Sequence, residues 1–192
     1  MTLLALLRHA ETAWSEQRRI QGRSDVPLSE TGRARLRAAM LPEACRGMRV
    51  ITSPLARCVE TAALLGAPQA PREPRIVEMD WGAWQGATLA ELRRRLGPAM
   101  LENEARGLDF RPEGGESPRE VLGRVQGWLA EIAREGEPTL AVTHRGVIRV
   151  ILAAALGWDM RGAPPAKLDW SAFHLFDLGT LGAPRVRSLN LK

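Results

Sequence analysis

Short apolar runs alternate with amphipathic segments along the 192 residues, and this alternation constrains the fold more than any other feature. The runs expected to form strands cover residues 3–7, 49–52, 75–78, 139–143, 172–177 and 185–191. The helices expected between them cover residues 29–40, 53–66, 88–96, 117–136 and 146–156. Strands that alternate with helices form a parallel sheet with helices on both faces. The sequence therefore predicts a three-layer α/β/α sandwich with a mostly parallel sheet, in one domain over residues 1–192.

A long connection precedes the most clearly marked helix. That helix has Ser117 as its cap, Pro118 at its first position, Glu120 closing a capping box and Gly136 at its end. The connection before it covers residues 81–116 and holds only the short helix expected over 88–96. Long connections in compact domains are often functional. We therefore expect residues 81–116 to form a lid or a substrate loop.

Four of the expected strands are followed by side chains suited to catalysis. Arg8 and His9 end the first run, and Arg57 lies in the first turn of the helix after the second run. Glu78 ends the third run, and His144 follows the run over 139–143. Ligands of open parallel sheets bind beyond the carboxyl ends of the strands. These five side chains are therefore expected to meet in one site.

This set of side chains suits phosphoryl transfer through a histidine. A neutral imidazole nitrogen is a competent nucleophile for phosphorus, and its other nitrogen is expected to donate to a backbone carbonyl. Two guanidinium groups and a second imidazolium can hold the three equatorial oxygens. A carboxylic acid can protonate the leaving oxygen. Because cationic side chains supply the charge, the sequence predicts no metal ion and no cofactor.

Five motifs occur in order over about the first 150 residues. They are LLRHAET, SPLARCVETA, EMDWGAWQG, GGES and VTHRGVIR. Together they resemble the histidine phosphatase superfamily, also called the phosphoglycerate-mutase-like family. The resemblance implies a six-stranded sheet flanked by helices, with one strand antiparallel. It also implies that His9 is the nucleophile that becomes phosphohistidine.

The resemblance assigns roles to the other site residues as well. Arg8, Arg57 and His144 would line the phosphate pocket, and Glu78 would be the proton donor and acceptor. The polar atoms of Gln21 and Gly22 would approach the phosphate. Asp80 is a rival for this role, but the family pattern favours Glu78.

Four positions depart from the common family pattern. Ala10 and Ser15 replace a glycine and an asparagine, so a hydroxyl stands where an amide would contact the phosphate. Gln85 replaces a glutamate in the usual WEG. Arg145 replaces a glycine after His144, and this added cation either favours a more anionic substrate or points to solvent.

Several other residues have a structural interpretation. His174 lies in the expected strand over 172–177 and is expected to be structural or exposed. Glu116 is expected to interact with the dipole of the helix that follows it. Trp81 and Trp84 belong either to the core or to the wall of the substrate pocket.

The composition limits the partners of the chain. Of the 27 basic residues 25 are arginine, but they are spread along the helices, so no nucleic-acid partner is expected. No stretch is apolar enough to span a membrane, and two cysteines outside any CxxC pattern indicate reduced thiols in the cytoplasm. The expected partner is a small phosphorylated substrate, and the sequence leaves monomer and homodimer open.

The first functional hypothesis is a metal-independent phosphomonoesterase. A cofactor-dependent phosphoglycerate mutase is an alternative, although such mutases usually carry segments for which this chain is short. A catalytically silent protein that binds phosphorylated ligands is another alternative, and the presence of every expected catalytic residue argues against it. A metallohydrolase is disfavoured because the histidines lack HxH or HExxH spacing and arginines would repel a metal.

Overall fold

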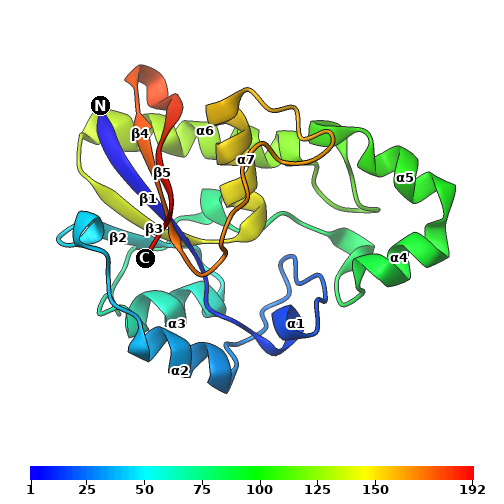
Figure 1. Cartoon of the computed structure of the whole chain (residues 1–192), viewed down its shortest axis with the longest axis horizontal. Helices are drawn as coiled ribbons and strands as arrows, with labels where there is room; N and C mark the ends of the chain where they lie inside the picture. Colours follow the sequence, from blue (N-terminus) through cyan, green and yellow to red (C-terminus); the bar gives the residue numbers. More distant parts are fainter.

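The computed structural model describes residues 1–192 and contains a single sheet with the strand order β2-β3-β1-β4-β5 (Figure 1). The strands are β1 (Thr2–Arg8), β2 (Arg49–Thr52), β3 (Thr139–Thr143), β4 (Phe173–Leu178) and β5 (Pro184–Leu191). β1 pairs with β3 in parallel, as β3 does with β2. β4 runs antiparallel to both of its neighbours, β1 and β5. The fold is thus the mixed α/β class that the sequence predicts.

The sheet differs in detail from the expected one. It has five strands instead of six, and two of its four pairings, both made by β4, are antiparallel. Residues 75–78 form no strand; a 3₁₀ turn covers Pro74–Ile76. The chain meets the sheet edge only at Thr52, whose N–H donates to the Pro71 carbonyl (2.9 Å) and whose carbonyl accepts from the Glu73 N–H (2.8 Å). Proline has no N–H donor and fixes φ, so Pro71 and Pro74 prevent a longer ladder.

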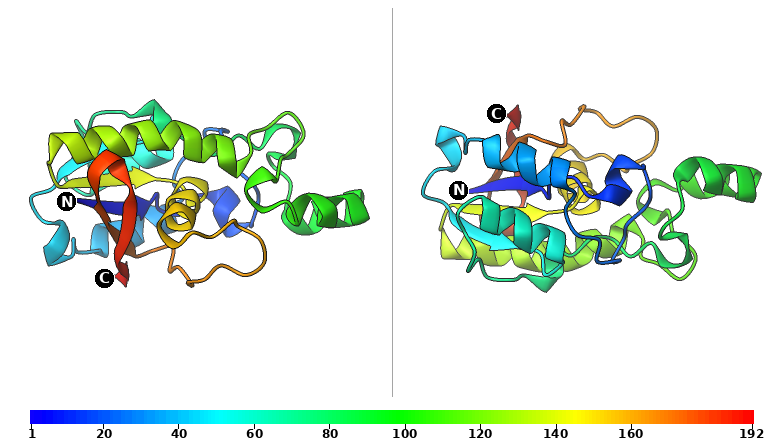
Figure 2. Two further views of the ribbon diagram at one scale, coloured as in Figure 1. Left: turned by 90° about the horizontal axis from the view of Figure 1, so that it is seen from above. Right: turned by 90° about the horizontal axis from the view of Figure 1, so that it is seen from below.

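The structure contains seven α-helices. They are α1 (Ala13–Glu16), α2 (Glu30–Ala38), α3 (Ala56–Leu64), α4 (Leu89–Leu96), α5 (Pro98–Glu104), α6 (Pro118–Glu135) and α7 (Arg145–Leu156). α2 and α6 lie on opposite sides of β1, so the molecule has three layers (Figure 2). α6 begins and ends as the sequence predicts. Ser117 caps its start and forms a capping box with Glu120, and Gly136 ends it in the left-handed conformation. The short helices α1 and α5 were not expected from the sequence.

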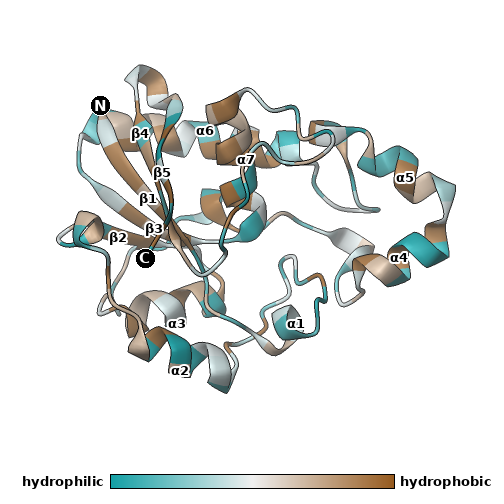
Figure 3. Cartoon of the chain, in the orientation of Figure 1, coloured by the Kyte–Doolittle hydropathy of each residue, from teal (hydrophilic) through white to brown (hydrophobic).

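The alternation of side chains along β1 divides the core between the two faces of the sheet. Leu4 and Leu6 pack with α6 and α7, whereas Ala5 and Leu7 face the opposite layer. Because successive side chains of a strand point to opposite faces, a slip of one residue would exchange these two sets. β1 and β3 are accordingly hydrophobic, while α2 and α4 carry hydrophilic residues (Figure 3). Both cysteines are buried, free thiols.

Residues 81–116 form a helical unit that projects from the three layers (Figure 1). It contains α4 and α5 and has a small core of its own, made of Trp84, Leu92 and Met100. Trp81 packs beside this core, with its ring centroid 5.6 Å from that of Phe110. Trp84 therefore belongs to a core, and the role of the segment as a lid stays a prediction. None of the helices combines the length and the apolar character needed to cross a membrane.

We expect Ser117→Ala to lower the free energy of unfolding by about 1 kcal/mol, because the side chain caps α6. Urea unfolding followed by circular dichroism measures this loss. Ser188→Ala is the matched control, because the Ser188 hydroxyl makes no hydrogen bond. Equal stability of the two variants would contradict the prediction.

Candidate active site

The parallel register of β1, β3 and β2 brings the strand ends together. Arg8 is paired with Thr143 at the ends of β1 and β3. The His9 N–H donates to the Thr143 carbonyl (2.9 Å), which extends the ladder by one residue. His9 and His144 therefore follow adjacent strand ends, and their ring centroids lie 5.4 Å apart. The structure thus brings together the two histidines that the sequence placed in one site.

His9 is held in one tautomer. It is buried, and its Nδ1 lies 2.7 Å from the Ala10 carbonyl oxygen. Because a carbonyl can only accept, Nδ1 carries the hydrogen and Nε2 keeps its lone pair. Burial, followed by the charges of Arg8 and Arg57, holds the pKa of His9 well below its ordinary value. The contact confirms the expected hydrogen bond to a backbone carbonyl, and the imidazole is neutral with Nε2 free to attack.

His144 is also neutral, and its tautomer is the opposite one. Its Nδ1 lies 3.4 Å from the Arg57 Nη2, which can only donate, so Nδ1 accepts. Its Nε2 then carries the hydrogen and donates to the Ser53 hydroxyl oxygen at 2.7 Å. Burial and the charge of Arg57 lower the pKa of His144 well below its ordinary value. These neighbours disfavour the charged form, so the imidazolium expected from the sequence stays a prediction.

Arg57 is fully buried and organises the loop after the first strand. Its Nη2 donates to the Gly22 carbonyl and its Nη1 to the Ser24 carbonyl, both at 2.7 Å. The Gln85 Oε1 accepts from the backbone N–H groups of Arg23 (2.6 Å) and Ser24 (3.1 Å). Arg57 thus binds the carbonyl groups of the loop, and Gln85 binds its N–H groups. Sequence reasoning missed this role of Gln85, which appeared there only as a lost carboxylate.

Two guanidinium nitrogens in the site have no partner. The Nε atoms of Arg8 and Arg57 are both buried without a hydrogen bond. Buried polar groups in folded proteins are nearly always paired, so unpaired donors need an explanation. An anion that reached these donors would satisfy them, which agrees with the phosphate pocket expected from the sequence.

Glu78 is buried beside the start of α7. Its Oε1 accepts from the backbone N–H groups of Met79 (2.9 Å) and Gly146 (3.0 Å). Burial raises the pKa of Glu78 in spite of these bonds and of the nearby Arg57. Its rival Asp80 instead accepts from the Gly82 N–H at 2.8 Å. Burial thus favours the acid form of Glu78, the form that can donate a proton.

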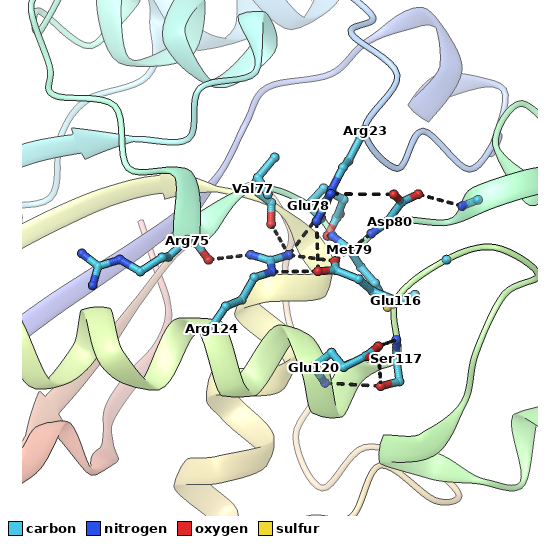
Figure 4. A network of polar contacts seen from close by, with 12 residues as sticks. Arg23, Arg75, Val77, Glu78, Met79, Asp80, Glu116, Ser117, Glu120 and Arg124 are labelled. Atoms are coloured by element: carbon cyan, nitrogen blue, oxygen red, sulfur yellow. Dashed lines mark hydrogen bonds and ion pairs between the residues drawn. The ribbon is translucent and has the colours of Figure 1, made fainter.

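A network of ion pairs fixes the backbone around Glu78 (Figure 4). The Arg124 guanidinium donates to the carbonyls of Val77 (2.7 Å) and Glu78 (3.2 Å). The Glu116 carboxylate accepts from Arg124 (3.2 Å), Arg23 (2.9 Å) and the Asp80 N–H (3.0 Å). Glu116 thus has a structural role that goes beyond a charge at a helix start. It ties the end of the projecting unit to the segment that carries Glu78.

Two expected phosphate ligands are engaged elsewhere. The Ser15 hydroxyl accepts from the Thr12 N–H and donates to the Thr12 carbonyl, both at 2.9 Å, as part of the cap of α1. The Gln21 Oε1 accepts from the Thr12 hydroxyl at 2.9 Å, which leaves its amide NH₂ free. A phosphate contact by Ser15 would therefore require this cap to open, because both hydrogen-bonding roles of the hydroxyl are in use.

Arg145 and His174 differ in their relation to the site. Arg145 is the first residue of α7, is exposed, and lies over the ring of Trp170. His174 is buried in β4, where its Nδ1 accepts from the Asn190 N–H at 3.3 Å. The structural interpretation of His174 is thus supported, whereas Arg145 stands at the rim of the site.

Comparisons with known proteins agree with this geometry. The family model of the histidine phosphatase superfamily (branch 1) matches residues 4–191. A bifunctional protein of Mycobacterium tuberculosis is 35% identical over 196 residues, which cover 98% of this chain and 54% of that protein. The chain thus spans about half the length of the first curated relatives that it matches.

Two further proteins are similar over most of the chain. A 2,3-bisphosphoglycerate-dependent phosphoglycerate mutase of Gloeobacter violaceus is 34% identical over 163 residues, or 79% of this chain and 74% of that protein. The solved structure of a mycobacterial glucosyl-3-phosphoglycerate phosphatase in complex with VO3 superposes with a TM-score of 0.81. It is 25% identical and covers 100% of both chains.

We expect His9 and His144 to stay neutral where an ordinary imidazole titrates, because their pKa values lie well below the usual one. The ring proton signals of both residues should stay constant from about pH 5.5 to 7.5, on either side of the ordinary pKa of about 6.5. An NMR titration of the wild type measures this, and His9→Gln assigns the signals. A midpoint near the ordinary value for either residue would contradict the prediction.

Proposed function

The chain belongs to the histidine phosphatase superfamily, and we propose that it hydrolyses phosphate monoesters through a phosphohistidine on His9, without a metal ion. The observation that carries this proposal is the state of His9. It is neutral, its Nε2 lone pair is free, and it lies among guanidinium groups with unpaired N–H donors. A nucleophile beside cationic donors is the arrangement that phosphoryl transfer requires.

In the first step the His9 Nε2 attacks phosphorus, and the bond between phosphorus and the ester oxygen breaks. Arg8 and Arg57 stabilise the charge on the equatorial oxygens. Glu78 carries the proton that the leaving alkoxide needs, because its raised pKa favours the acid form. The products are a phosphohistidine and an alcohol, and Glu78 is left as a carboxylate.

In the second step Glu78 takes a proton from water, and the oxygen of this water attacks phosphorus. The bond between phosphorus and Nε2 breaks, which releases inorganic phosphate and restores His9. The hydrogen bond from Nδ1 to the Ala10 carbonyl keeps the ring in the same tautomer throughout. Both steps therefore use the same carboxyl group, first as an acid and then as a base.

The alternatives differ in what accepts the phosphoryl group. A mutase would pass it from His9 to a hydroxyl of a second substrate instead of to water. The similarity to a phosphoglycerate mutase keeps this alternative open. The favoured substrate class is a small phosphorylated metabolite of the cytoplasm, and the similarity to a phosphatase over the full length of both chains supports hydrolysis.

We expect His9→Ala to lose hydrolysis of p-nitrophenyl phosphate by about a thousandfold or more, because the nucleophile is removed. The assay is run with a chelator from about pH 5 to 8, the range in which histidine titrates. His174→Asn is the matched control, a histidine outside the site. Loss of activity on addition of the chelator would contradict the mechanism, and so would activity that survives in His9→Ala. If the wild type bound phosphate without turnover, this would favour the mutase or a silent binder.

We expect Glu78→Gln to slow phenyl phosphate by about 100-fold and p-nitrophenyl phosphate only a few-fold, because only the poor leaving group needs a proton. For the wild type on phenyl phosphate, kcat/KM should fall as the pH rises through the raised pKa of Glu78, where the acid form is lost. This alkaline limb should be absent in Glu78→Gln. Equal losses on the two substrates would remove Glu78 from the role of acid.

A further inference from the structure

Arg145 lies between two residues of the site without belonging to its hydrogen-bond network. It directly follows His144, and the next residue, Gly146, donates its N–H to Glu78. Its side chain makes no hydrogen bond and no ion pair, and it is exposed. Its charge interacts with those of Arg8 and Glu78, which places the cation beside the site, with N–H donors that no group of the protein uses.

The Arg145 guanidinium lies over the ring of Trp170. The Arg145 Cζ lies 4.8 Å from the centroid of the Trp170 ring. Arg149, one helical turn later, repeats the arrangement with its Cζ 5.5 Å from the ring centroid of Trp158. Both tryptophans come from the loop between α7 and β4, which runs beside α7 (Figure 1). An aromatic ring orients a guanidinium but leaves the N–H donors at its edge free, unlike a carboxylate, which occupies them.

Around Glu78, the positive charges of the arginines outnumber the negative charges of the carboxylates. Arg23 and Arg124 are matched by Asp80 and Glu116, with which they form ion pairs. The remaining cations all lie near the carboxyl group of Glu78. They are Arg8, Arg57, Arg145 and Arg149. Asp25 also acts on Arg57, and Glu11, which pairs with Arg35, acts on Arg8.

A phosphate monoester does not balance these four cations. It carries about two negative charges at neutral pH, which Arg8 and Arg57 can match. Glu78 is buried and has a raised pKa, so it adds little further negative charge in its acid form. Positive charge therefore remains at the rim, where Arg145 presents free donors.

We propose that Arg145, oriented by Trp170, binds a second anionic group of the substrate, separate from the phosphoryl group that is transferred. A carboxylate or a second phosphate has this chemistry, because both accept two parallel hydrogen bonds from one guanidinium. This inference rests on the proposed function, since it names the substrate class of the same site. Arg145 is then a specificity-determining residue, and Trp170 is a positioning residue that acts through it.

A matched pair of substrates tests the proposal. 3-Phosphoglycerate and glycerol 3-phosphate carry the same phosphate ester, but only the first has a carboxylate. We expect the wild type to prefer 3-phosphoglycerate in kcat/KM and Arg145→Gln to lower this preference by about tenfold or more. Trp170→Leu should lower it about threefold, because the guanidinium is retained but no longer oriented. Arg46→Gln, an exposed arginine at the opposite end of the parallel strands, should keep the wild-type preference.

Fructose 1,6-bisphosphate and fructose 6-phosphate form a second pair, which distinguishes a second phosphate from a carboxylate as the preferred anion. Loss of the preference in Arg145→Gln for either pair supports the proposal. The proposal would be overturned if the wild type preferred neither compound in the first pair and neither in the second. Equal losses of Arg145→Gln on both members of each pair would also overturn it, because Arg145 would then contact the transferred phosphoryl group.

Binding to an inactive variant separates this proposal from the proposed function. Calorimetry with His9→Ala measures the affinity for 3-phosphoglycerate and for glycerol 3-phosphate without turnover. The double variant His9→Ala with Arg145→Gln should lose about tenfold in affinity for the first compound relative to the second. This result would support the anion site even if the wild type hydrolysed no monoester, and an unchanged ratio would refute it even if hydrolysis were established.

Discussion

The parallel pairing of β1 with β3, and of β3 with β2, is the constraint on which the rest of the site depends. The backbone hydrogen bonds from His9 to Thr143 and from Ser53 to Val142 continue the two ladders beyond the strands. These bonds align His9, Ser53 and His144 side by side, each directly after the carboxyl end of its strand. Because these bonds are made by the backbone, the side chains are free to differ in chemistry while their positions stay fixed.

The carboxyl ends of the strands also concentrate positive charge, which carboxylates of the protein neutralise only in part. Buried Arg57 bonds two backbone carbonyls instead of an acid, and Arg8 has an unpaired Nε. Such groups are costly to bury unless they are compensated. The cost is balanced only in part by the protein, so the site is electrostatically complementary to an anion. Burial out of water, and then the charges of the neighbouring arginines, lower the pKa values of His9 and His144.

Glu78 shows how irregular backbone is stabilised beside the candidate site. It follows a 3₁₀ turn instead of a strand, so no sheet ladder holds its carbonyl. Arg124 from α6 supplies the missing donors, and Glu116 joins Arg124 to Arg23 from the loop that surrounds Arg57. The projecting unit, the loop over 21–25 and the segment that carries Glu78 are thereby connected through three side chains. The position of the acid thus depends on residues far from it in sequence.

Much of this protein was decided locally by the sequence. The apolar runs, the Ser117 cap with Glu120 and the terminating Gly136 specify their elements through periodicity and backbone chemistry, which neighbouring residues suffice to define. The meeting of the candidate site residues at the strand ends was predictable for the same reason, since parallel strands align their carboxyl ends.

The tertiary structure decided the rest through contacts between distant residues. It joined the chain before the third expected strand to the sheet only at Thr52, through hydrogen bonds to Pro71 and Glu73. It made His144 neutral through burial beside Arg57, engaged Ser15 in a helix cap, and turned Gln85 into the support of a loop. Protonation states and hydrogen-bond partners depend on which groups meet after folding and on how much water remains, and no local pattern contains that information.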